Sequence, residues 1–119
     1  MSKQIKYSST RGGENSLSYE DVLLSGLARD GGLFMPEEWP HFSFSELEDM
    51  KSLDYAELAT KIMCPFIEPC LSEKEVFKLC KDSYSSFNEG IAPLYNLKNN
   101  TYILELFHGP TFAFKDYAM

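Results

Sequence analysis

The sequence lacks the features of membrane proteins and of nucleic-acid-binding proteins. No apolar run approaches the roughly 20 residues that span a bilayer, and residues 1–6 contain no apolar segment of the kind found in secretory signals. Only 11 Lys and Arg residues stand against 18 Asp and Glu residues, and the basic ones are scattered, so a net charge of -7 offers no basic patch to a phosphate backbone. We therefore expect a cytoplasmic protein with no nucleic-acid or membrane partner.

Metal ligands are also scarce. The three cysteines, Cys64, Cys70 and Cys80, fit neither a CxxC pair nor the spacing of a zinc ligand set, and their number is odd. His41 lies beside Trp39 and Pro40 and has no partner that would make it a ligand. We expect no metal site, and we expect reduced thiols that are buried or half-buried.

The residues that are present predict a small core built mostly from helices. Apolar residues make up 44% of the chain and aromatic residues 14%, which is enough for one ordinary domain. Capping signals and helical spacing indicate the helices, and turn residues separate them from short extended segments. The expected elements are a strand at 4–9, a helix of about ten residues from a Ser18 cap to Ala28, an extended segment at 33–36, a short helix at 43–50, a longer helix from Asp54 with a kink or break at Pro65, a helix from Ser72 to about Ser86, a turn at 98–100 and a buried strand at 102–107.

The pattern changes near Gly90, where helical spacing gives way to strand patterning. One or two strands and a short helix cannot bury both of their faces alone, so the last part reads as the opening of a larger domain. The fold class predicted is α+β, with a mostly helical domain at 1–90 that has a small β component, and the start of an α/β domain at 91–119.

The sharpest chemical signal is Lys115, which lies between Phe114 and Asp116 just after a Gly-Pro loop. With Thr111 as the N-cap of a helix, Lys115 would lie near the positive end of the helix dipole, which disfavours its ammonium form. Aromatic neighbours could also desolvate the amine, and both conditions suit a lysine that forms Schiff bases. His108 is a possible base in the same loop. The alternative is a surface helix with an ordinary Lys-Asp pair.

A second cluster combines the hydroxyl and guanidinium groups of Ser9, Thr10 and Arg11 with the glycines at 12 and at 31–32. Such groups can bind an anion through backbone amides and a guanidinium. A strand end, a helix stop and a turn explain most of the same residues, so this pattern by itself is weak.

Together the two clusters resemble the N-terminal portion of the threonine synthase family. The resemblance rests on three blocks in the family's order: residues 7–12 (YSSTRG), 26–36 (GLARDGGLFMP) and 104–116 (LELFHGPTFAFKD). The last block is highly specific, and the similarity extends over all 119 residues.

The resemblance implies a lyase of threonine biosynthesis that depends on pyridoxal phosphate and has fold type II. On this basis Lys115 would hold the cofactor as a Schiff base, Asp116 would set the electrostatics beside it and Phe114 would pack close to it. Ser9, Thr10 and Arg11 would lie on the substrate side of the cleft. The family reaction converts O-phospho-L-homoserine and water to L-threonine and phosphate.

The family needs several hundred residues, so the resemblance also implies that most of the cofactor pocket lies outside this chain. We therefore expect a truncated form that binds no cofactor and is inactive alone. The alternatives are a threonine synthase-like phospholyase that does not make threonine, and a free-standing helical interaction module. An exposed strand at 102–107 could also promote self-association.

Overall fold

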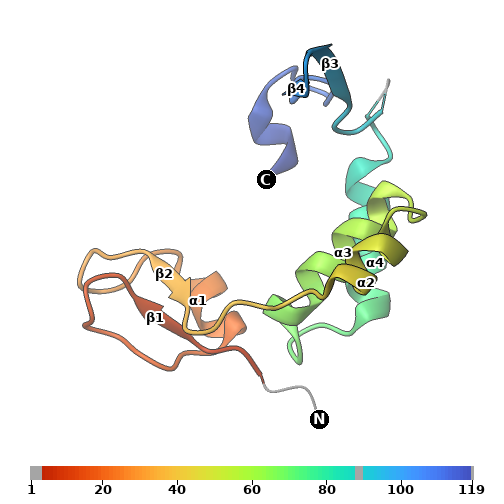
Figure 1. Cartoon of the computed structure of the whole chain (residues 1–119). Coiled ribbons are helices and arrows are strands. Elements are labelled where there is room, and N and C mark those ends of the chain that lie inside the picture. Colours follow the sequence, from red (N-terminus) through yellow and green to blue (C-terminus); the bar gives the residue numbers. More distant parts are fainter. Residues whose placement is uncertain (1–3, 88–89, 119) are drawn as a thin grey trace. The chain divides into compact units, whose positions relative to one another are not determined.

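The chain folds into two compact units that contain helices and two small antiparallel sheets (Figure 1). This computed structural model describes residues 4–87 and 90–118. The units are Met1–Phe77 and Lys78–Met119. The elements are β1 (Tyr7–Ser9), α1 (Tyr19–Ser25), β2 (Phe34–Pro36), α2 (Phe44–Met50), α3 (Tyr55–Ile67), α4 (Glu73–Tyr84), β3 (Leu94–Lys98), β4 (Thr101–Leu104) and a 3-10 helix at Phe114–Tyr117. The predicted mixture of helices and small sheets is confirmed, whereas the domain boundary near Gly90 stays a prediction.

The first sheet pairs β1 with β2 and is tied to α3 by one buried side chain. Tyr7 lies opposite Pro36 and Ser9 lies opposite Phe34 in antiparallel register. The buried Tyr7 hydroxyl donates a hydrogen bond of 2.7 Å to the backbone carbonyl of Phe66, in the last turn of α3. Two segments 59 residues apart in the sequence are thereby joined.

We expect Tyr7→Phe to lower the free energy of unfolding by about 1 kcal/mol, because the Phe66 carbonyl loses its donor. Urea unfolding measures this change, and Tyr95→Phe, on an exposed tyrosine of β3, is the matched control. Burial raises the pKa of Tyr7 above its ordinary 10.0, and the nearby Tyr19 raises it further. The contribution of the Tyr7 hydroxyl to the free energy of unfolding should therefore be complete below pH 10, and it should be lost as the pH rises through the raised pKa. Equal stability of wild type and Tyr7→Phe at pH 7 would contradict this account.

Helix α1 begins where its cap predicts but ends earlier than expected. Ser18 and Asp21 form a reciprocal capping box, in which each side chain accepts from the other residue's backbone N–H. The helix has seven residues and stops at Ser25, because Gly26 takes a φ of 70° and its N–H closes the last turn on Val22. The predicted extension to Ala28 is wrong. The positive φ of Gly31 belongs to a separate turn whose N–H donates to the carbonyl of Ala28.

The other helices follow their capping signals closely. Ser43 with Glu46 and Asp54 with Glu57 form capping boxes at the starts of α2 and α3. At the start of α4, the Ser72 backbone N–H and hydroxyl both donate to the Glu75 carboxylate. Helix α3 continues through Pro65 to Ile67 instead of breaking, although the proline has no N–H to donate to the carbonyl one turn earlier. Within the described residues no helix is long and apolar enough to cross a membrane.

Few side chains are buried, and most of those that are lie on these helices. The residues buried on α2, α3 and α4 are Met50, Thr60, Cys64, Ile67, Val76 and Cys80. Cys70 is exposed, so the expectation that every thiol is at least half-buried is wrong for this residue. Helix α1, by contrast, has no buried residue, and Leu24 is 80% exposed.

The second sheet is a two-stranded hairpin, β3 and β4, in unit 2. Asn99 and Asn100 connect the strands with φ values of 47° and 60°, the left-handed backbone that a tight hairpin turn requires. The predicted buried strand at 102–107 is wrong in extent and in burial. Strand β4 ends at Leu104, and every residue of both strands is exposed.

Candidate active site

Lys115 lies in the short 3-10 helix at the end of unit 2, and its side chain is exposed. The helix begins at Phe114, and its N-cap is Ala113, which makes no side-chain cap. The prediction that Thr111 is the N-cap, with Lys115 four residues into a helix, is therefore wrong. Phe114 is 65% exposed, so in this structure it does not desolvate the amine.

The Thr111 side chain instead binds the carboxylate of Asp116. Its hydroxyl donates to Asp116 Oδ1 at 2.5 Å, and its backbone N–H donates to Oδ2 at 2.8 Å. These bonds, the hydroxyl bond first, hold the pKa of Asp116 below its ordinary 3.8. Asp116 therefore closes the loop that precedes Lys115, and it is not the partner of the adjacent amine.

The loop that precedes the 3-10 helix contains a left-handed residue, Phe112, and a close backbone approach at Gly109. Phe112 has a φ of 57°, and its N–H donates to the carbonyl of Gly109 at 3.1 Å. Gly109 is buried, and a Cβ placed on it would lie 2.5 Å from both Cβ and Oδ2 of Asp116. Only glycine allows this approach of the backbone to the carboxylate.

We expect Gly109→Ala to displace the Asp116 carboxylate from Thr111 and to raise the pKa of Asp116 toward its ordinary value. Titration of the carboxyl carbon by NMR measures this shift. Thr111→Val should produce a smaller rise, because it removes the hydroxyl and keeps the backbone N–H. Thr101→Val, on exposed strand β4, is the control. An unchanged Asp116 pKa in Gly109→Ala would contradict the account that the bonds from Thr111 lower this pKa.

An aromatic cluster anchors the 3-10 helix within unit 2. The ring of Tyr117 lies 4.9 Å from that of Phe87, which lies 5.5 Å from that of Tyr84. The Tyr117 hydroxyl donates a short hydrogen bond to the backbone carbonyl of Ile91. The residue two positions after Lys115 is thus fixed to the segment that precedes β3.

His108 pairs with a carboxylate in the same loop. Its Nε2 lies 2.7 Å from Glu105 Oε2, and the two side chains are 13% and 28% exposed. The sequence analysis singled out His108 as a possible base but not Glu105. The spacing of three residues was the signal that could have found it.

The second predicted cluster comes together in unit 1 around Asp30, a residue within the predicted segments to which the prediction gave no role. Asp30 accepts hydrogen bonds from the hydroxyl of Ser9 at 2.7 and 2.9 Å, and from the backbone N–H groups of Gly13 and Gly32, each at 2.8 Å. The Ser9 bond first, and then the Gly32 bond, hold the pKa of Asp30 below its ordinary 3.8. The hydroxyl of Ser9 and these two backbone N–H groups are therefore occupied by a carboxylate of the chain itself.

Arg11 and Thr10 support the same network. Arg11 is exposed and donates from Nη1 to the backbone carbonyl of Asp30 at 2.9 Å. The Thr10 hydroxyl accepts from the N–H of Leu33 at 3.1 Å. Ser9, Thr10 and Arg11 thus lie around Asp30 in unit 1, whereas Lys115, Asp116 and Phe114 lie in unit 2.

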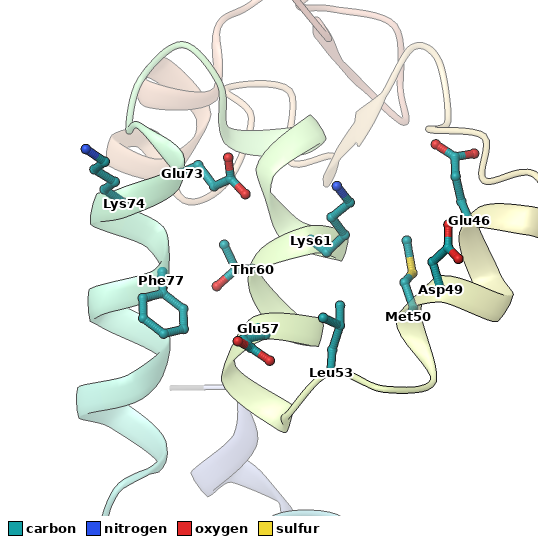
Figure 2. Close-up of a pocket in the computed structure, with 10 residues that line it drawn as sticks. All are labelled: Glu46, Asp49, Met50, Leu53, Glu57, Thr60, Lys61, Glu73, Lys74 and Phe77. Atoms are coloured by element: carbon teal, nitrogen blue, oxygen red, sulfur yellow. The ribbon is translucent and has the colours of Figure 1, made fainter.

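A separate pocket of about 530 Å³ lies among α2, α3 and α4, and none of the predicted site residues lines it (Figure 2). Met50, Leu53 and Phe77 supply its apolar wall. Two of its carboxylates, Glu46 and Glu57, are engaged in capping boxes. In the described residues 4–87 and 90–118, no cluster of three or more His, Cys, Asp or Glu side chains is arranged to hold a metal.

Comparison with known proteins gives these residues a family context. Residues 6–84 match the family described as "Threonine synthase N terminus". The threonine synthase of Pseudomonas aeruginosa is 45% identical over 116 residues, which cover 97% of this chain and 25% of that protein. The threonine synthase of Schizosaccharomyces pombe is 46% identical over 121 residues, which cover 100% of this chain and 24% of that protein.

A solved structure agrees with the sequence matches. The crystal structure of threonine synthase from Brucella melitensis with bound pyridoxal phosphate superimposes with a TM-score of 0.90 at 39% identity. The match covers 96% of this chain and 25% of that one, so the chain spans about a quarter of the length of its relatives. The matched residues 6–84 and the identity of the relatives show that the chain belongs to the threonine synthase family.

Proposed function

We propose that the chain provides the N-terminal part of a pyridoxal-phosphate-dependent threonine synthase, which converts O-phospho-L-homoserine and water to L-threonine and phosphate. The chain spans a quarter of its relatives, so this activity is proposed for the complete protein. In that protein the chain contributes the lysine that holds the cofactor and residues on the substrate side.

One observation carries the assignment of Lys115. In the part of the chain that the structure describes, no hydrogen-bond or ion-pair partner is found for the Lys115 amine, although a carboxylate follows it directly in the sequence. Asp116 is turned away because Thr111 donates to both of its oxygens. An amine without a salt bridge is available to bond the aldehyde carbon of pyridoxal phosphate, so the residues fit this cofactor.

The roles of the individual residues follow from this arrangement. Pyridoxal phosphate, when bound, supplies an electron sink for negative charge on the substrate carbons. Lys115 holds the cofactor through Nζ and, once released by the substrate amine, moves protons at those carbons. Asp116 fixes the loop that precedes Lys115 through its bonds to Thr111, and its negative charge contributes to the electrostatics of the site. Phe114, which is exposed in this chain, packs near the cofactor in the complete protein.

We assign Ser9, Thr10 and Arg11 to the substrate side, with different tasks. The Ser9 and Thr10 hydroxyls are engaged with Asp30 and with the backbone of Leu33, so they hold the loop in place. Arg11 is exposed and uses Nη1 for its bond to Asp30, which leaves further N–H groups to meet the anionic substrate.

The experiment is a chimera in which this chain replaces the matching quarter of the Pseudomonas aeruginosa relative. We expect the purified chimera to form threonine from O-phospho-L-homoserine and to restore growth without threonine in a threonine-requiring strain. The relative without its matching quarter is the negative control. A folded chimera that releases phosphate without forming threonine would favour the phospholyase alternative, and a folded chimera with neither activity would overturn the proposal.

A further inference from the structure

Glu105, the residue that follows β4, joins three segments of unit 2. Its N–H donates to the carbonyl of Pro93 at 3.0 Å, so its backbone is fixed to the residue that precedes β3. Its carboxylate Oε2 lies 2.7 Å from His108 Nε2. Its carbonyl oxygen lies 3.5 Å from the hydroxyl of Tyr117, two residues after Lys115. All of these partners belong to unit 2, so each contact is made within one compact unit.

The His108 ring is held at its edge and on its face. An ionised carboxylate can only accept a hydrogen bond, so the ring carries a proton at Nε2 and donates it to Glu105. The Phe107 ring lies against the imidazole, with the two ring centroids 4.6 Å apart and the planes inclined by 30°. The His108 and Glu105 side chains are both partly shielded from water, which strengthens the hydrogen bond between them. These contacts fix the orientation of the ring.

This orientation affects Lys115 through the backbone of the loop. Gly109 follows His108, and its carbonyl accepts from the N–H of Phe112 at 3.1 Å. Gly109 also lies so close to Asp116 that a Cβ placed on the glycine would be 2.5 Å from the Cβ of Asp116. Asp116 directly follows Lys115 in the chain. A shift of the His108 backbone would therefore move Gly109 against Asp116 and displace the lysine.

We propose that Glu105 is a positioning residue for Lys115. By holding His108, its carboxylate fixes the path of the loop, and the loop then presents Lys115 Nζ in the orientation that bonds the cofactor aldehyde. The inference rests on the proposed function, because it concerns the reaction of this amine. Glu105 acts through the loop and not by contact with the cofactor. A misplacement of about 1 Å can slow a reaction by roughly a hundredfold, so the effect is large enough to measure.

Timed capture of the cofactor by the chimera with the Pseudomonas aeruginosa relative tests this role. Pyridoxal phosphate is added to the cofactor-free protein, borohydride stops the reaction at intervals, and mass spectrometry measures the fraction of Lys115 that carries the cofactor. We expect Glu105→Ala to slow this capture by about tenfold or more. It should lower kcat for threonine formation by a similar factor while KM changes by less than about threefold, because substrate binding is left intact.

Two further variants separate positioning from a general effect on the fold. Glu105→Gln keeps an oxygen that accepts from His108 Nε2, so it should recover most of the parent rate of capture. Asp82→Ala, which removes an exposed carboxylate of α4 in the same unit, is the matched control and should behave like the parent. The midpoint of thermal unfolding is measured for each variant, since a purely structural role would lower the midpoint and leave capture by the folded protein unchanged.

His108→Ala removes the same contact from its other side, and it is the second variant if Glu105→Ala does not fold. It should slow capture as much as Glu105→Ala, and the double variant should be no slower than either single variant, because one contact is lost in all three. A folded Glu105→Ala or His108→Ala protein that captures the cofactor at the parent rate would overturn the inference, as would effects that add in the double variant. A parent chimera that never acquires the cofactor on Lys115 would overturn the proposed function and, with it, the role of Glu105.

Discussion

Lys115→Ala is expected to abolish covalent retention of pyridoxal phosphate in the chimera with the Pseudomonas aeruginosa relative, because it removes the amine that bonds the cofactor. Threonine formation should fall by at least about a thousandfold, as for other residues that act directly in a reaction. The measurement is borohydride reduction of the loaded protein, followed by mass spectrometry of its peptides. In the parent chimera the cofactor should be found on the peptide that contains Lys115.

Lys98→Ala is the matched control, since it removes an exposed lysine of the same unit that lies on β3. It should retain the cofactor and the activity of the parent chimera. Lys115→Arg tests the covalent bond to the cofactor separately from the positive charge, because arginine keeps the charge and cannot form that bond. Trapping of the cofactor on a different lysine of the folded chimera would contradict the role of Lys115.

Asp30→Asn should markedly destabilise unit 1 of the chain. The carboxylate accepts from Ser9, Gly13 and Gly32, and an asparagine would turn its NH₂ group toward at least one of these donors. Gly32 is buried, and a Cβ on it would lie 2.2 Å from Ser9 Oγ, so the loop has little room to rearrange. We expect the midpoint of thermal unfolding at pH 7 to fall by roughly 5 °C or more.

The pH dependence distinguishes this network from a general loss of charge. The pKa of Asp30 is lowered in the folded chain, so its stabilisation is present above the ordinary value of 3.8 and is lost as the pH falls through the lowered value. The difference in the midpoint of thermal unfolding between wild type and Asp30→Asn should therefore become smaller in strong acid. Asp49→Asn, at an exposed carboxylate on α2, should behave like wild type. If the difference in unfolding midpoint persisted unchanged below the lowered pKa, the stabilisation would not come from the ionised Asp30 carboxylate.

The helix starts could be predicted because their signals are local. The Ser43 and Ser72 caps each lie three residues before the glutamate that completes them, and the structure contains both pairs. The turn at Asn99 and Asn100 was predicted for the same reason, since asparagine tolerates the left-handed backbone. Helix α1 was extended too far because apolar spacing continues past Gly26, and the positive φ of that glycine takes precedence over the pattern.

The candidate site was predictable in its members but not in its contacts. Lys115 was found from its immediate neighbours, but the role of Thr111 was predicted wrongly, because its hydroxyl can cap a helix or bind a carboxylate. Asp30 was missed as the centre of the Ser9 cluster because the two residues are 21 positions apart. The spacing of residues in the sequence does not show which side chain accepts hydrogen bonds from several donors that meet only in the folded chain.

The sequence by itself determined the order of the elements, the caps of the four α-helices and the lysine that resembles the cofactor lysine of the family. These depend on interactions within a few residues, which a short stretch of sequence contains in full. The tertiary structure alone decided that Asp30 occupies the predicted anion site, that Thr111 clamps Asp116, and that β4 is left exposed. Each of these depends on how the backbone folds back on itself, and a hydrogen bond is specified only when donor and acceptor meet in space.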